Sequence, residues 1–188
     1  MRYLILVFAY IVCVHVSCIE SNTQTNKTEH IRSTDKSKVQ TDQRVGDIYQ
    51  HYTAVPKSQF QRDENVLIDY IVENGLDCTR AENGLYYTIH QMGDGELLGR
   101  GSPVKADYKG YFLDGKIFDS SYQRGKPIRF TVGQMAAGWD QGMTYVNRGS
   151  KITLLLPSFL AYGEEGFQDI VPPNTVLVFE IDIKKEAY

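Results

Sequence analysis

The sequence has few cysteines, few histidines and no strongly basic run, and these shortages exclude several classes of protein. Three cysteines without a C-x-x-C pair argue against a disulfide framework and against a cysteine zinc site. The formal net charge is −3, from 20 basic and 23 acidic residues, which argues against nucleic-acid binding. The four histidines form no H-E-x-x-H or H-x-x-E-H, and no G-x-G-x-x-G opens a dinucleotide loop. The sequence therefore predicts no metal and no cofactor.

No apolar run reaches the roughly 20 residues that cross a bilayer, but a shorter one follows a basic start. Residues 3–16 are apolar apart from His15, and Ser17 precedes Cys18. This pattern is typical of a secretory signal peptide at 1–17. It also resembles the lipobox of bacterial lipoproteins, which implies a lipidated Cys18 at the mature N-terminus. An ordinary signal peptide that happens to contain this cysteine is the alternative.

The leader predicts where the protein is found. We expect the cell envelope of a Gram-negative-type bacterium, on the periplasmic face, with the membrane contacted through the N-terminal lipid. A soluble periplasmic or secreted protein is the alternative. Residues 19–43 are rich in Ser, Thr, Asn, Gln and Lys and show no apolar periodicity, so they predict a flexible tether.

A helical segment is expected over residues 44–83. Ser58 and Gln61 fit a capping box, and residues 74–75, Asn-Gly, supply a stop. One apolar stripe at helical spacing is formed by Val66, Leu67, Tyr70 and Ile71. Together these signals predict a helix over 59–74.

From residue 84 onward the apolar residues alternate with polar ones, which is typical of half-buried strands. The expected strands are 85–89, 104–112, 116–118, 128–132, 150–156 and 175–183, with a short helix at 135–143. An antiparallel sheet must bury its apolar face, and the short helix is the available cover, so an α+β domain is predicted.

Five segments in this domain carry a resemblance to a known family. They are YKG at 108–110, GKIFDSS at 115–121, GWDQG at 138–142, AYG at 161–163 and VPPNTVLVF at 171–179. Their order resembles the FKBP-type peptidyl-prolyl cis/trans isomerases over residues 101–185, within a domain of 84–186. The resemblance implies an FKBP-like fold, a five-stranded antiparallel half-barrel around one short helix, here preceded by the N-terminal helical segment.

The resemblance also implies an apolar pocket for a proline ring. Its aromatic floor and walls would be Trp139, Tyr108, Phe118, Phe130 and Phe179. Asp119 matches the family's pocket carboxylate, Arg124 is its expected partner, and Tyr162 matches the hydroxyl that donates to a ligand carbonyl.

The rest of the implied pocket includes departures from the family pattern. Ile170 and Val171 would line the flap, and Met135 and Ala136 replace a pair of branched apolar residues. Ile128 stands where the family has an aromatic residue, and the flap carries Phe167 at a position that is often polar. The last two are expected to support the pocket.

These features predict a peptidyl-prolyl isomerase that assists the folding of exported proteins. The implied partners are proline-containing polypeptide clients and macrolide inhibitors. The alternative is a catalytically weak binding module or chaperone of the same fold. A third possibility is that the chain resembles the FKBP lipoproteins associated with gliding motility. The oligomeric state is not indicated.

Overall fold

The computed structural model describes residues 43–187. The predicted signal peptide, the lipidation site Cys18 and nearly all of the predicted tether lie outside these residues. Within 43–187, no helix is both long enough and apolar enough to cross a membrane.

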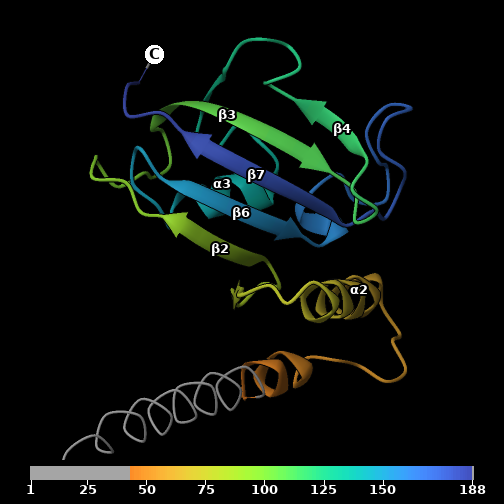
Figure 1. Ribbon diagram of the computed structural model, residues 1–188. Coiled ribbons are helices and arrows are strands. Elements are labelled where there is room, and N and C mark those ends of the chain that lie inside the picture. The colour runs from red at the N-terminus through yellow and green to blue at the C-terminus, as the bar shows by residue number, and fades with distance from the viewer. Residues whose placement is uncertain (1–42, 188) are drawn as a thin grey trace, which may run out of the picture. The chain divides into compact units, whose positions relative to one another are not determined.

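One antiparallel sheet forms the centre of the domain (Figure 1). Its strands are β1 (Thr79–Arg80), β2 (Tyr86–Gln91), β3 (Pro103–Tyr111), β4 (Ile117–Ser120), β5 (Ile128–Thr131), β6 (Lys151–Leu156) and β7 (Leu177–Ile183). The order is β1-β2-β6-β7-β3-β4, and β5 also pairs with β3.

The strand count exceeds the five that the resemblance implies, for a simple reason. β5 pairs with the first half of β3, at 103–106, and β4 pairs with its second half, at 109–111. The two short strands therefore share one position at the edge of the sheet. With the two-residue β1 set aside, five positions remain, and the FKBP-like fold is confirmed.

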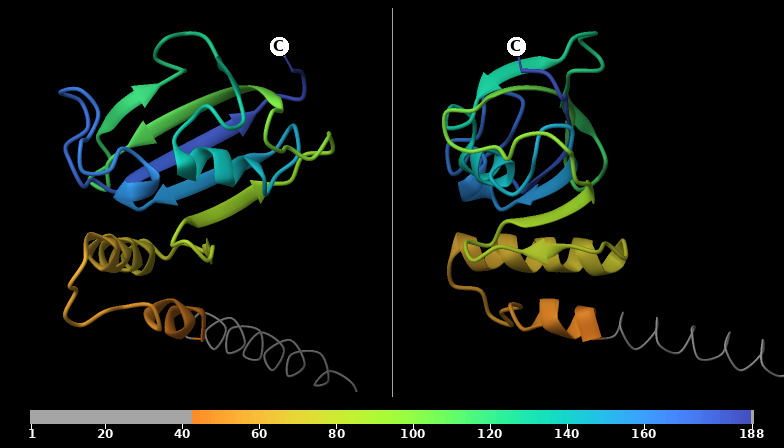
Figure 2. Two further views of the ribbon diagram at one scale, coloured as in Figure 1. Left: turned by 180° about the vertical axis from the view of Figure 1, so that it is seen from behind. Right: turned by 90° about the vertical axis from the view of Figure 1, so that its left-hand side faces the viewer.

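Helix α3 (Ala137–Met143) lies against one face of the sheet and closes the main core (Figure 2). The helix begins two residues later than the sequence predicts. The backbone N–H groups of Gly133 and Met135 donate to the Asp140 carboxylate, at 2.8 and 3.3 Å. These bonds hold the approach to the helix in a turn instead of a helical conformation.

Helix α2 (Gln59–Glu73) packs against the opposite face of the same sheet. Its Leu67, Ile68 and Ile71 lie in a second core cluster with residues that include Leu155 and Val178. Neighbouring residues of β6 thus belong to different core clusters, one on each face of the sheet, because successive side chains on a strand point to opposite faces.

The start of α2 is the one that the sequence predicts. The Ser58 hydroxyl accepts from the Gln61 N–H, and the Gln61 side chain accepts from the Ser58 N–H, which completes the capping box. Residues 43–49 are also helical.

Candidate functional site

Trp139 lies at the centre of an aromatic cluster between α3 and the sheet. Its ring meets three others nearly edge-on, with centroids at 5.2 Å from Tyr108, 5.3 Å from Phe179 and 5.5 Å from Phe130. Edge-to-face packing places the positive edge of one ring on the negative face of another, which fixes ring orientation as well as distance. The indole is 2% exposed, so it forms a rigid apolar floor.

A second group of rings extends the cluster along β3 and β4. Phe118 packs edge-on against Phe179, with ring centroids 5.6 Å apart, and its ring is tilted by 45° against Phe112, with centroids 5.2 Å apart. Phe112 was not among the residues predicted from the sequence. The signal was present in the strand periodicity. Residues 108, 110 and 112 are two apart, so they lie on the same face of the strand, and Tyr108 on that face was among the predicted site residues.

Gly110 is the small residue that allows these rings to come together. A Cβ atom at this position would lie 2.7 Å from Phe118 Cζ and 2.8 Å from Phe179 Cε1. We expect Gly110→Ala to displace both rings and to lower several-fold the activity on a prolyl peptide that the resemblance implies. Gly99→Ala, at a glycine with open space around it, is the control and should leave the rate unchanged. Equal rates for the two variants would contradict the prediction.

A polar network lies beside the aromatic floor. Asp119 accepts hydrogen bonds from the Tyr108 hydroxyl and from Arg124 Nη1. Arg124 Nη2 also donates to the Tyr108 hydroxyl, at 2.9 Å, so the three side chains form a closed triangle. Asp119 and Arg124 are both partly exposed, and the triangle therefore lies between the aromatic cluster and solvent.

The triangle depends on a protonated tyrosine. Burial, followed by the bond to Asp119, raises the pKa of Tyr108 from 10.0 to about 12. Burial above all likewise raises the pKa of Tyr86 from 10.0 to about 12. Since both pKa values are higher in the folded state, the two neutral hydroxyls favour folding fully below pH 10, and that contribution is lost as the pH rises toward 12.

We therefore expect the free energy of unfolding to fall between pH 10 and pH 12. Urea titrations at several pH values would measure this fall. Tyr108→Phe should reduce its size, because that variant has no proton to lose at this position. If the free energy of unfolding of Tyr108→Phe falls as steeply with pH as that of the parent, Tyr108 does not contribute to the fall.

The flap after η1 (Ser158–Leu160) forms the remaining wall. The Tyr162 ring stacks on Phe167 with centroids 4.8 Å apart. A pair of backbone hydrogen bonds of 2.8 and 3.0 Å joins Phe167 to Val171 and closes the flap turn. Burial, and to a lesser extent the charge of Asp119, raises the pKa of Tyr162. The Tyr162 hydroxyl thus remains a donor at neutral pH, in the electric field of the carboxylate.

The residues implied by the resemblance fall into two groups. The buried or half-buried ones pack on the main core: Tyr108, Phe118, Ile128, Phe130, Met135, Trp139, Tyr162, Val171 and Phe179. Ala136 is half-buried and lies at the N-cap of α3. Ile170 and Phe167 are 45% and 40% exposed, and they lie at the outer edge of the flap.

Residues 95–184 match the family model of the FKBP-type peptidyl-prolyl cis-trans isomerases. The 22 kDa FKBP-type isomerase of Escherichia coli K12 is 36% identical over 141 residues, which cover 73% of this chain and 68% of that protein. The chain belongs to this family. Among solved structures, FkpA from Escherichia coli superposes with a TM-score of 0.60 at 28% identity, covering 86% of this chain and 69% of that one.

Other members of the family are considerably longer than the matched region. A probable FKBP-type isomerase of Haemophilus influenzae is 37% identical over 109 residues, and the match spans 58% of this chain but 45% of the relative. The chain thus spans about half the length of several curated relatives that it matches.

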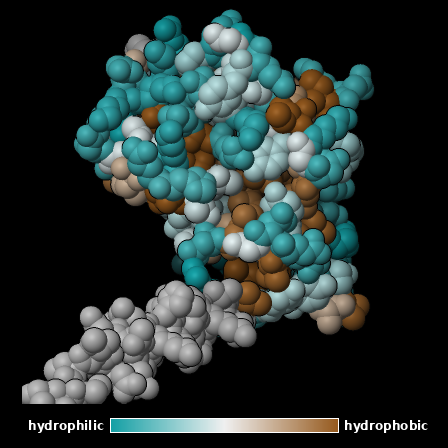
Figure 3. Space-filling model, in the orientation of Figure 1, coloured by the Kyte–Doolittle hydropathy of each residue, from teal (hydrophilic) through white to brown (hydrophobic). Residues whose placement is uncertain are grey.

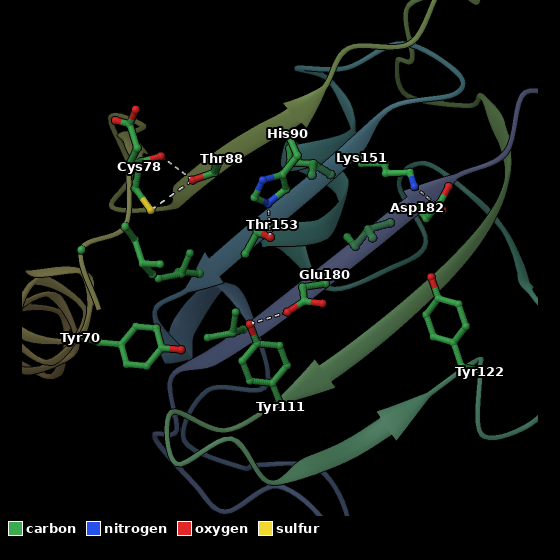
Figure 4. Close-up of a pocket in the computed structure, with 17 residues that line it drawn as sticks. Tyr70, Cys78, Thr88, His90, Tyr111, Tyr122, Lys151, Thr153, Glu180 and Asp182 are labelled. Carbon is green, nitrogen blue, oxygen red and sulfur yellow. Dashed lines mark hydrogen bonds and ion pairs between the residues drawn. The ribbon is translucent and has the colours of Figure 1, made fainter. Parts of the chain in front are cut away.

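A different hollow, of about 640 Å³, lies on the sheet face that α2 partly covers (Figure 4). Figure 3 shows apolar side chains exposed among polar ones on this side of the molecule. Its polar groups bond to one another: His90 to Thr153 at 2.8 Å and the Tyr111 hydroxyl to Glu180 at 3.0 Å. None of the predicted pocket residues lines this hollow. With these four polar groups already paired, it is a poorer candidate for chemistry than the aromatic site.

Proposed function

We propose that this chain is a peptidyl-prolyl cis/trans isomerase that buries a proline ring in the aromatic pocket around Trp139. The observation that carries the proposal is the arrangement of the site. Three rings pack edge-on against one indole, the Asp119–Arg124–Tyr108 triangle lies beside them, and the Tyr162 hydroxyl lies on the flap. Family membership supports the same activity.

The chemistry requires no bond to break. Rotation about an X-Pro bond is slow because the C–N bond is partly double, which sets a barrier of roughly 18–20 kcal/mol. The twisted transition state has lost amide resonance and is less polar along C–N than the planar ground state. An apolar, water-excluding site shaped for the twisted form therefore binds the transition state better than the substrate, which is the requirement for catalysis. A ten-thousandfold acceleration needs about 5–6 kcal/mol of such preference.

Substrate carbonyls need donors at the pocket edge. The Met135 N–H is bonded to Asp140 and the Ile170 N–H to the Phe167 carbonyl, so neither of these backbone groups is free to bind a substrate carbonyl. The Tyr162 hydroxyl and the Ala136 N–H, which has no hydrogen-bond partner among residues 43–187, are the donors that we assign to this task. The Asp119 carboxylate orients and polarises the site, and it transfers no proton.

A refolding assay tests the function directly. The full chain is added to a denatured protein whose refolding is limited by a prolyl bond, and the slow phase is followed by fluorescence of that substrate. We expect the slow phase to accelerate in proportion to the concentration of the chain, and a macrolide of the FKBP-binding class to suppress the effect. A slow phase unchanged from buffer would contradict the isomerase proposal and leave the binding-module alternative.

We further propose that the isomerase works in the cell envelope on exported proteins. In this arrangement Cys18 carries the lipid after removal of residues 1–17, residues 19–43 act as the tether, and residues 44–83 precede the domain of 84–186. Metabolic labelling with a radioactive fatty acid tests the anchor. Label should appear on the parent protein and disappear in Cys18→Ala. An unlabelled parent, or label that survives the substitution, would overturn the anchor without affecting the isomerase.

A further inference from the structure

Helix α2 lies outside the segment that matches the family model, yet one of its side chains reaches the loop that carries the flap tyrosine. The Asp63 carboxyl group accepts from both the backbone N–H and the hydroxyl of Ser158, at 2.8 and 2.6 Å. Asp63 is 2% exposed and Ser158 is 1% exposed, so the contact is sealed from water. The other oxygen of Asp63 accepts from the Gln59 side chain at 2.6 Å, which steadies the carboxyl group on its own helix.

Ser158 passes this contact on to the residues on either side of Tyr162. Its carbonyl oxygen accepts from the N–H of Ala161 at 2.9 Å and from the N–H of Gly163 at 2.8 Å. Every polar group of Ser158 is therefore engaged: the N–H and hydroxyl by Asp63, and the carbonyl by the two neighbours of Tyr162. A displacement of Ser158 would strain these two hydrogen bonds to the neighbours of Tyr162.

Packing on both sides of Asp63 holds helix α2 in place. Leu67, Ile68 and Ile71, one to two turns further along α2, are buried against the sheet. At the other end of the helix the Phe60 ring packs on Phe159, with centroids 5.6 Å apart. Asp63 thus projects from an element that is fixed on both sides of it.

Loss of the carboxyl group would be costly at this place. Two buried donors of Ser158 would be left without acceptors, and buried polar groups without partners are strongly disfavoured. Movement of Ser158 toward water would relieve that penalty, and it would carry the 161–163 backbone with it.

We propose that Asp63 is a positioning residue that orients Tyr162 through Ser158, so that the N-terminal helix is part of what makes the isomerase pocket competent. The proposal rests on the isomerase function proposed above. It extends the functional unit beyond the residues that the family model matches, because the residue concerned belongs to α2.

The helix offers a matched control. Glu64 is the next residue and is also buried, but its carboxylate pairs with Arg80 at 2.6 Å and does not bond to the flap loop. Asp63→Ala and Glu64→Ala each remove one buried acid from the same turn. Asp63→Asn is the conservative variant, because its amide oxygen can still accept from Ser158.

The experiment measures kcat and KM on a prolyl peptide for the full chain and these three variants. We expect Asp63→Ala to lower kcat and kcat/KM alike by about tenfold, as a lost transition-state contact does. We expect kcat and kcat/KM of Asp63→Asn and Glu64→Ala to stay within about threefold of the parent values. Asp63→Asn keeps its activity because its amide oxygen still accepts from Ser158. If Asp63→Ala and Glu64→Ala lose equal activity at equal loss of thermal midpoint, the positioning role is overturned.

A second readout separates this proposal from the isomerase function. NMR shifts of the Gly163 amide and the Tyr162 ring should move in Asp63→Ala and stay in place in Glu64→Ala. Unchanged shifts overturn the positioning role even in an active enzyme, whereas an inactive parent overturns only the function. If Asp63→Ala does not fold, Ser158→Ala takes its place, since it removes the hydroxyl alone. The same resonances should then move by a smaller amount, and their failure to move would overturn the proposal.

Discussion

Replacing Trp139 with alanine is expected to destabilise the domain by about 3–5 kcal/mol, the cost of emptying a fully buried aromatic site. The indole is in edge-on contact with Tyr108, Phe130 and Phe179, and these rings cannot close the gap without leaving their own strands. Proteins of this size are stable by about 5–15 kcal/mol in total, so the loss is a large share. Urea unfolding followed by circular dichroism measures it.

Two further variants test the expected loss of stability. Trp139→Phe keeps an aromatic floor and should lose less stability than the alanine variant. Phe167→Ala removes an aromatic ring that is 40% exposed on the flap, and it should change the unfolding midpoint little. If Phe167→Ala proves as destabilising as Trp139→Ala, the indole is not the centre of the core that the ring contacts indicate.

Removal of Phe118 together with Asp119 is expected to have the largest effect on activity. The double variant Phe118→Ala with Asp119→Ala takes away one wall of the pocket and the carboxylate that binds the Tyr108 hydroxyl and Arg124. Both side chains are partly exposed, so the fold should survive and the far-ultraviolet spectrum should be retained. We expect the isomerase rate to fall at least about tenfold, which corresponds to about 1.4 kcal/mol of transition-state stabilisation.

The matched control replaces another aromatic residue and another aspartate, neither of them among the proposed pocket residues. Tyr122 is an exposed ring, and Asp114 caps a surface turn by accepting from the Lys116 N–H at 2.9 Å. Tyr122→Ala with Asp114→Ala should keep the parental rate. A Phe118/Asp119 double variant as fast as this control would show that the pocket has been assigned to the wrong residues.

The local structure was largely predictable because its signals are local. The alternation of apolar residues predicted β3, and the Ser58–Gln61 capping box predicted the start of α2. Both β4 and β5 were predicted as separate strands, but it was not evident that they share one edge position, because that depends on how each segment pairs with β3. Local patterns describe elements, whereas pairing is decided by residues far away in the sequence.

The pocket illustrates the same limit. A single tryptophan among aromatic residues on a sheet usually indicates an ordinary core, and only the ordered motifs of the family suggested a binding site for Trp139. Phe112 contacts Phe118 but belongs to none of those motifs, and it was missed. The bond from Asp63 to Ser158 joins residues 95 positions apart, and no local pattern marks either partner.

The chain contains one tryptophan, and we propose that this tryptophan is the floor of the substrate pocket. Its intrinsic emission is therefore a signal from a single known place, free of the overlapping contributions that complicate spectra of other proteins. If the proposal holds, a proline ring bound against the indole changes the surroundings of the only strong ultraviolet fluorophore in the molecule. Occupancy of the site can thus be followed in the unmodified protein, with no dye, label or engineered reporter.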